Sequence, residues 1–258
     1  MADLPFASAL VTGASSGIGA EMARQLGDAG VPTVLVARRR DRLEELAARY
    51  DGFEVLEADL TEPEGVALTA ERIMSDDRPV ELVVNNAGFG TSGMFHELDP
   101  ERLAGEIDLN VRALTVLSHA ALTAMRPRGV GYLLNVSSVA SFQASAGLAV
   151  YAATKAYVTS LTEALHEEAR GSGVNVTALC PGLTKTEFQD HSNSSELEAR
   201  FPGFAWTTVE QVAADGLRDV ASNKTISVPG NLYKGLVFTS DITPRALSRR
   251  ISGIVSRQ

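Results

Sequence analysis

The sequence predicts a single α/β domain in which a doubly wound parallel sheet of seven strands carries helices on both faces. Three observations predict this fold. Short apolar runs alternate with helical patterns along the chain, several of these runs lack polar alternation, and no repeat or linker divides the sequence. Strands that alternate with helices form βαβ units, and continuous apolar runs are typical of strands buried on both faces. The domain is expected to span residues 1–258.

Each expected strand is a short run rich in apolar and β-branched residues. The seven runs are 9–12, 33–37, 53–57, 82–85, 132–136, 175–179 and 225–228. The intervening stretches have helical patterns, and two of them begin with a proline, which suits the first turn of a helix. The expected helices are 17–29, 40–49, 63–75, 100–125, 150–170 and 209–221.

Composition and charge narrow the class of function. Hydrophobic residues make up 45% of the 258 residues and charged residues 21%, which is ordinary for a soluble globular protein. The net charge of −9 argues against a nucleic-acid partner, because phosphate backbones require a basic surface. The lone Cys180 excludes an intrachain disulfide and favours a reducing, cytoplasmic location. Neither a transmembrane segment nor a metal site is expected, since no long apolar run and no histidine cluster occurs.

A glycine-rich turn follows the first expected strand and precedes a helix. Gly13, Gly17 and Gly19 are spaced Gly-x-x-x-Gly-x-Gly. Glycines allow a sharp turn and close approach of a ligand, and the N–H groups at a helix start favour a pyrophosphate. The turn therefore predicts a dinucleotide site. It also matches the Gly-x-Ser-x-Gly elbow of hydrolases with Ser15 as nucleophile, but no convincing Asp and His partners follow.

A tyrosine and a lysine are paired in the helix expected over 150–170. Tyr151 and Lys155 lie four residues apart, so they share one face of that helix. A nearby ammonium favours the charged form of a phenol and lowers its pKa. Such a phenol can exchange a proton with the oxygen of an alcohol or a ketone. The pair is weak evidence alone and gains force from Ser138, thirteen residues earlier.

Several motifs stand together in one order along the chain. They are Thr12-Gly13-Ala14-Ser15-Ser16-Gly17-Ile18-Gly19, Asn85-Asn86-Ala87-Gly88, Ser138, Tyr151 with Lys155, and Pro181-Gly182. In this order and at these spacings the chain resembles the short-chain dehydrogenase/reductase family, from Thr12 to about Thr186. The resemblance implies a Rossmann-like fold and an enzyme that transfers a hydride between a nicotinamide cofactor and a carbonyl or secondary alcohol.

The resemblance also implies catalytic roles. In the family a tyrosine is the acid/base, a lysine lowers its pKa and holds the nicotinamide ribose, and a serine orients the substrate oxygen. An asparagine holds a water that links the lysine to solvent. The matching residues are Tyr151, Lys155, Ser138 and Asn110. Ser137 is the neighbour most easily confused with Ser138, but strand geometry turns the two to opposite faces, and the spacing to Tyr151 favours Ser138.

The expected cofactor is NADP(H) rather than NAD(H). Sites that prefer NAD commonly carry an acid after the second strand, where it binds the ribose 2′-hydroxyl. Here Ala37 takes that place and Arg38 and Arg39 follow. A guanidinium suits a 2′-phosphate, so Arg38 is expected to be its main contact and Arg39 the second. A solvated basic helix start is the alternative reading.

Further cofactor contacts are expected where other strands end. Asp59 either lies near the adenine or belongs to a helix cap, and both roles are compatible. Thr186 is expected to contact the nicotinamide carboxamide, with Thr184 as the alternative. The expected contacts are Gly13, Ser15, Ser16, Gly17, Ile18, Gly19, Arg38, Arg39, Asp59, Leu60, Asn86, Ala87, Gly88, Tyr151, Lys155, Pro181, Gly182, Leu183, Thr184 and Thr186.

The remaining expectations concern the substrate and the assembly. The irregular stretch 187–206 reads as a substrate lid or as a surface excursion, and 231–258 as a C-terminal extension. A lipophilic ketone or aldehyde is the expected substrate because aromatic residues suggest an apolar pocket. These residues are Phe142, Phe188, Phe201, Phe204 and Trp206. By resemblance a homodimer or homotetramer is expected. The alternatives are a 3-ketoacyl-thioester reductase and a non-catalytic NADP(H)-binding regulator on the same fold.

Overall fold

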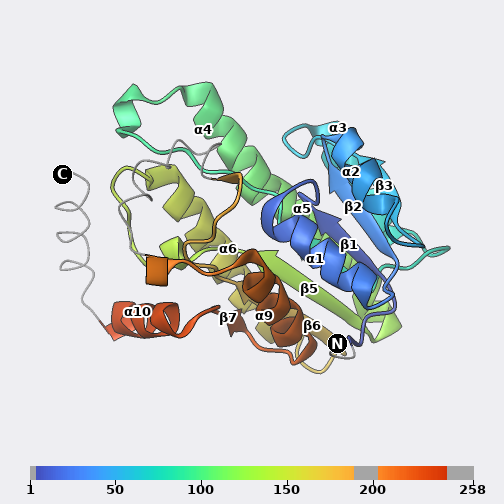
Figure 1. Ribbon diagram of the computed structural model, residues 1–258. Coiled ribbons are helices and arrows are strands. Elements are labelled where there is room, and N and C mark those ends of the chain that lie inside the picture. Colours follow the sequence, from blue (N-terminus) through green and yellow to red (C-terminus); the bar gives the residue numbers. More distant parts are fainter. Residues whose placement is uncertain (1–3, 189–202, 243–258) are drawn as a thin grey trace.

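The computed structural model describes residues 4–188 and 203–242 (Figure 1). Seven parallel strands form one sheet in the order β3-β2-β1-β4-β5-β6-β7, which confirms the expected doubly wound α/β fold. The strands are β1 (Ala9–Thr12), β2 (Thr33–Ala37), β3 (Glu54–Glu57), β4 (Leu82–Asn85), β5 (Gly131–Val136), β6 (Val174–Leu179) and β7 (Ile226–Ser227).

Helices cover both faces of the sheet (Figure 1). The core on one face joins the sheet to α1 (Gly17–Asp28), α2 (Arg40–Ala47) and α9 (Val209–Ala221). The core on the other face joins it to α3 (Pro63–Met74), α5 (Leu114–Arg128) and α6 (Ala149–Glu168). Successive strand residues alternate between the two cores, as Leu10 and Val11 do in β1. Because both faces are buried, the strands need no polar alternation.

The region expected as one helix over 100–125 is interrupted. It consists of α4 (Pro100–Ile107), the π-helix η2 (Asp108–Ala113) and then α5. A π-helix inserts an extra residue in a turn, and such insertions often mark functional sites. Here it contains Asn110. The described part of the chain also contains α10 (Asn231–Ile242), within the segment expected only as a C-terminal extension.

The order of the strands locates the ligand crevice. Successive strands run outward from β1 to β3, and β4 returns to the other side of β1. In such sheets ligands bind outside the carboxyl ends of the strands, where the direction of winding reverses. The glycine-rich turn after β1 and the Asn85-Asn86-Ala87-Gly88 segment at the end of β4 meet at this point.

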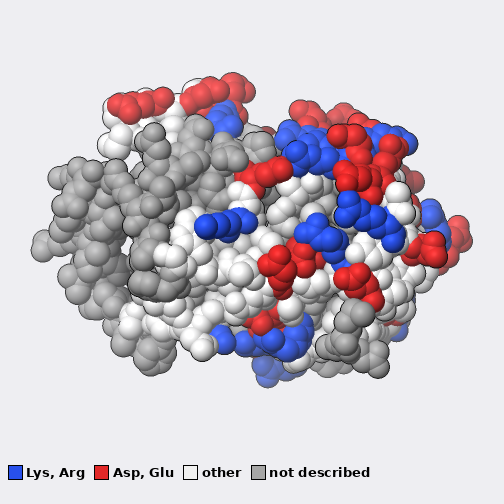
Figure 2. Space-filling model, in the orientation of Figure 1, with Lys and Arg blue, Asp and Glu red and all other residues white. Residues whose placement is uncertain are grey.

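Charged side chains of both signs are interspersed over the face of the molecule seen in Figure 2. The two arginines of α2 are both paired with acids, Arg40 with Glu44 of the same helix and Arg42 with Glu187. The exclusion of nucleic acid as a partner stays a prediction. Within the described ranges, no helix is long and apolar enough to cross a membrane.

Candidate active site

The glycine-rich turn leaves room for a ligand because its glycines carry no side chains. Gly13 and Gly17 have φ angles of +66° and +56°, a region that favours glycine. A Cβ at Gly19 would collide with the Asn86 amide and the Gly13 carbonyl. The backbone before α1 thus packs directly against the end of β4, and the N–H groups that start α1 border the cavity described below.

Asn86 braces this turn. Its side-chain amide donates to the Thr12 carbonyl at 2.8 Å, and its backbone N–H donates to the Thr12 hydroxyl at 2.9 Å. The Ala87 N–H reaches the same hydroxyl at 3.0 Å. These bonds hold the ends of β1 and β4 together, so Asn86 has a structural role in the turn.

Two arginines after β2 have different surroundings. The side chain of Arg38 is 70% exposed and lies 3.6 Å from Asp59. Arg39 instead turns toward the glycine-rich turn and donates to the hydroxyls of Ser15 at 3.0 Å and Ser16 at 2.8 Å. It also forms an ion pair of 2.8 Å with Glu187. The guanidinium and the two hydroxyls therefore border one space that suits an anion.

Carboxylates near these arginines are held ionised. Glu187 binds both Arg39 and Arg42, and hydrogen bonds from the two guanidinium groups lower its pKa. Burial alone would raise the pKa of Asp59, but hydrogen bonds from the Thr61 backbone and hydroxyl, together with Arg38, lower it. Asp59 thus orders the turn before α3, and it also lines the cavity beside Arg38.

The two serines after β5 have separate partners. The Ser137 hydroxyl donates to the Lys155 carbonyl at 2.8 Å and shares a 2.7 Å hydrogen bond with Thr159, so it ties β5 to α6. The Ser138 hydroxyl accepts from the Ala140 N–H at 3.1 Å at the start of the 3₁₀ helix η3 (Val139–Phe142). That bond leaves the Ser138 proton available for a substrate oxygen.

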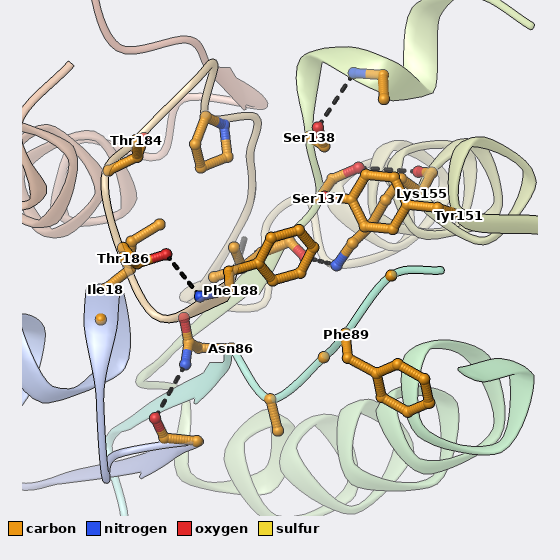
Figure 3. Close-up of a pocket in the computed structure, with 18 of the residues that line it drawn as sticks. Ile18, Asn86, Phe89, Ser137, Ser138, Tyr151, Lys155, Thr184, Thr186 and Phe188 are labelled. Carbon is orange, nitrogen blue, oxygen red and sulfur yellow. Dashed lines mark hydrogen bonds between the residues drawn. The ribbon is translucent and has the colours of Figure 1, made fainter. Parts of the chain in front are cut away.

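Tyr151 and Lys155 project from α6 into the same region as Ser138 (Figure 3). The Lys155 ammonium lies 5.8 Å from the centre of the Tyr151 ring and donates to the Val136 carbonyl at 2.9 Å. Burial lowers the pKa of Lys155 to about 8, against opposing effects of Cys180 and Glu106. The Tyr151 ring also packs against Phe188, whose ring centre is 5.5 Å away.

Asn110 is fixed by the chain after β4. Its amide donates to the Phe89 carbonyl at 2.8 Å and to the Thr154 hydroxyl at 3.2 Å, and it accepts from the Phe89 N–H at 3.2 Å. A Cβ at Gly88 would lie 2.9 Å from the Asn110 oxygen and 3.4 Å from the Lys155 nitrogen. Glycine at position 88 therefore lets the π-helix and α6 approach each other at the reacting end of the cavity.

The loop after β6 is held by a tyrosine of α10. The Tyr233 hydroxyl accepts from the Leu183 N–H at 3.0 Å and donates to the Ala205 carbonyl at 2.6 Å. The ring packs so closely on Gly182 that any Cβ there would collide with it. Thr186 lies against Gly17, and its hydroxyl accepts from the Phe188 N–H at 3.2 Å. The loop thus bridges the glycine-rich turn and the substrate end.

A cavity of about 1000 Å³ joins these parts. It runs from the glycine-rich turn past Arg38 and Asp59 to Ser138, Tyr151 and Lys155. All of the expected catalytic and cofactor residues lie on its wall except Asn110 and Gly19, which lie behind it. Its length, its glycine cradle and its basic end suit a nicotinamide dinucleotide.

The far end of the cavity is largely apolar. Its wall there includes Phe142, Leu148, Phe188, Leu236 and Val237. Of the aromatic residues expected in this pocket, Phe142 and Phe188 line it, whereas Trp206 packs under Lys185 outside the wall. Phe201 and most of the expected lid, residues 189–202, lie outside the described residues, as does the side chain of Phe204.

Sequence reasoning missed residues that reach the site from a distance. Tyr233, Arg42 and Glu106 are examples, and only Tyr233 lines the cavity. Tyr233 sits in a helix that the sequence pattern did not predict. Glu106 is an acid on the buried face of the amphipathic helix α4. An acidic residue at a position where the helical pattern expects an apolar one is a signal that could have identified it. The described residues contain no group of three or more potential metal ligands.

Comparison with known proteins identifies the family. Residues 7–197 match the family model described as short chain dehydrogenase. An uncharacterized oxidoreductase from Myxococcus xanthus (strain DK1622) is 36% identical over 240 residues, which cover 90% of this chain and 91% of the relative. The chain belongs to the short-chain dehydrogenase family. It is an NAD(P)-dependent oxidoreductase.

Solved structures of other short-chain dehydrogenases agree with this fold. A short-chain dehydrogenase from Sphingobium yanoikuyae in complex with NADPH has a TM-score of 0.81 and 33% identity, covering 92% of this chain and 96% of that one. The bulky-bulky ketone specific alcohol dehydrogenase from Comamonas testosteroni has a TM-score of 0.77 and 28% identity, covering 95% and 96%.

Proposed function

We propose that this short-chain dehydrogenase transfers a hydride between NADP(H) and a carbonyl or secondary alcohol, and that it reduces a lipophilic ketone or aldehyde. The observation that carries the proposal is the placement of Ser138, Tyr151 and Lys155 around one end of a cavity whose other end is a glycine cradle with Arg39. The apolar far wall supports a lipophilic substrate. The relative specific for bulky ketones also supports such a substrate, and the NADPH-bound relative supports NADP(H) as the cofactor.

The residues divide the chemistry as follows. When bound, the cofactor supplies a hydride to the carbonyl carbon. Tyr151 gives its proton to the carbonyl oxygen, and Ser138 donates a hydrogen bond that orients that oxygen. Lys155 favours the phenolate that Tyr151 becomes, because the positive charge lies beside the ring. Asn110 fixes the backbone of Phe89 beside Lys155. Oxidation of an alcohol reverses these transfers.

The basic end of the cavity supports NADP(H) over NAD(H). Arg39 and the Ser15 and Ser16 hydroxyls converge on one space, where a 2′-phosphate would add an anion to existing donors. Arg38 is far more exposed and is already paired with Asp59, so this geometry favours Arg39 as the main contact. Thr184, Thr186 and the backbone around Leu183 would hold the nicotinamide end.

A homodimer or homotetramer formed through α5 and α6 is part of the proposal. Apolar side chains are exposed beside these helices at Ile107 (47%), Val116 (40%) and Tyr157 (40%). Burial of these side chains against a second copy of the chain would remove their apolar surface from water. The mass in solution, measured by light scattering after gel filtration, tests this. A monomer at micromolar concentration would contradict it.

The test of function is NADPH consumption at 340 nm on a panel of aliphatic, aromatic, steroid and thioester-linked carbonyls. Tyr151→Phe should lose at least about 10²-fold in rate while NADPH binding survives, since a positioned acid/base contributes about 10²–10⁴-fold. Tyr50→Phe is the matched control, because Tyr50 does not line the cavity and its hydroxyl bonds Asp28 at the surface. Near-full turnover by Tyr151→Phe would refute the assignment.

A further inference from the structure

A buried carboxylate lies behind the reacting end of the cavity. Glu106, in the last turn of α4, is 0% exposed. Neither of its carboxylate oxygens has a hydrogen-bond partner of good geometry among the described residues, and the same holds for the buried hydroxyl of Thr91. An ionised carboxylate is costly to bury without partners, so this position calls for a physical explanation.

The charges that act on Glu106 come from two helices. Lys155 lies on α6, which packs against α4, and Arg102 lies one turn earlier on α4 itself. Burial raises the pKa of Glu106 to about 6, and the Thr91 hydroxyl, Lys155 and Arg102 oppose this rise. Asn110, which adjoins Lys155, follows Glu106 by four residues in the same helical run. Glu106 is therefore electrostatically coupled to the centre at which Tyr151 acts.

Lys155 needs a counter-charge to remain an ammonium in this place. Burial favours its neutral form, and two groups oppose that effect: Cys180 and Glu106. Burial raises the pKa of the Cys180 thiol to about 11, so Cys180 carries no charge near neutral pH. Glu106 is ionised above about pH 6. Near neutral pH, Glu106 is thus a source of negative charge for Lys155 from the neighbouring helix.

We infer that Glu106 is a positioning residue for proton transfer: its carboxylate keeps Lys155 charged, and through Lys155 it sets the pH range in which Tyr151 exchanges its proton. The inference rests on the roles proposed above for Tyr151 and Lys155. Glu106 is buried and does not line the cavity, so it acts on the reacting groups from behind the cavity wall. Without the Glu106 carboxylate, a smaller fraction of Lys155 is charged. The Tyr151 phenolate then receives less stabilisation, which raises the pKa of the phenol.

Alcohol oxidation reports this coupling, because it requires the Tyr151 phenolate. In Glu106→Gln the acid limb of the kcat/KM profile should move to higher pH by about 0.5–1 unit, which is a loss of roughly 3–10-fold on that limb. Glu106→Asp, which keeps a carboxylate, should restore the limb toward its original position. Glu101→Gln is the matched control, because Glu101 is an exposed acid on the same helix. An unmoved limb in Glu106→Gln would overturn the inference.

A second measurement needs no turnover. Carboxyl signals of ¹³C-glutamate are titrated by NMR in the full chain, and the signal absent from Glu106→Gln is assigned to Glu106. Its midpoint should rise in Lys155→Met, because a positive charge beside the carboxylate is lost. An unchanged midpoint would overturn the inference even if every kinetic test succeeded. If no carbonyl or alcohol is turned over, the proposed function fails, and this titration still decides whether the two charges are coupled.

Discussion

Cofactor preference gives the sharpest prediction, because two adjacent arginines can be compared. Arg39→Leu removes the guanidinium that binds the Ser15 and Ser16 hydroxyls, while Arg38→Leu removes one that is 70% exposed. Both variants lose one positive charge from the same turn after β2. Any difference between them therefore reports the position of the charge and not the net charge of the protein.

The magnitude follows from the contacts. A charge-assisted hydrogen bond contributes about 1.5–3 kcal/mol, so Arg39→Leu should weaken NADPH binding by roughly 10–150-fold. The ion pair with Glu187 offsets part of this, because Glu187 and a 2′-phosphate compete for one guanidinium. An exposed ion pair contributes about 1 kcal/mol or less, so Arg38→Leu should weaken NADPH binding by about fivefold at most.

Fluorescence titration with NADPH and with NADH measures both affinities without a substrate. NADH lacks the 2′-phosphate, so its affinity should change by less than about twofold in either variant, since no charged contact is lost. An equal loss for NADPH and NADH in Arg39→Leu would show that the residue only supports the fold. A larger loss in Arg38→Leu than in Arg39→Leu would reverse the assignment of the main contact.

Three other outcomes test the structure. The pKa of Glu106 is raised from 4.5 to about 6. The resulting contribution to stability is fully present below pH 4.5 and is lost as pH rises through 6. In urea unfolding, the free energy of unfolding of Glu106→Gln relative to that of the wild type should therefore rise by up to about 2 kcal/mol between pH 4.5 and 7.5. A difference that stays constant with pH would argue against this. Tyr233→Phe removes the bonds to Leu183 and Ala205 and should lower the free energy of unfolding by about 2–4 kcal/mol, measured in the same way. Gly19→Ala places a Cβ against the Asn86 amide and the Gly13 carbonyl, so NADPH affinity should fall at least about tenfold by titration, and unchanged affinity would contradict the close packing.

The sequence predicted the sheet because local patterns report burial directly. Each expected strand is present, although the last is only Ile226–Ser227, and the motifs all fall at strand ends or on α6 as expected. The interruption of the helix around Asn110 was not predicted, since apolar periodicity does not reveal one extra residue in a turn. The π-helix is instead accompanied by contacts of Asn110 with Phe89 and Thr154, which are distant in the chain.

Other parts of the site depend on contacts that no local pattern encodes. The sequence analysis expected Arg38 as the main contact of the 2′-phosphate, whereas the geometry favours Arg39, whose side chain turns toward Ser15. Tyr233 reaches Leu183 across fifty positions, from a helix whose start follows Pro229 and Gly230 and so resembles a turn. Long-range packing decides these cases, and propensity does not.

The most direct test of the central claim follows the hydride itself. NADPH labelled with deuterium at the transferred position is supplied with lipophilic ketones, and the alcohol is analysed by mass spectrometry. The wild type should place one deuterium on the carbinol carbon, and Tyr151→Phe should lose at least about 10²-fold of that product. Tight binding of NADPH without label in any product would contradict hydride transfer at this site and would favour a binding role instead.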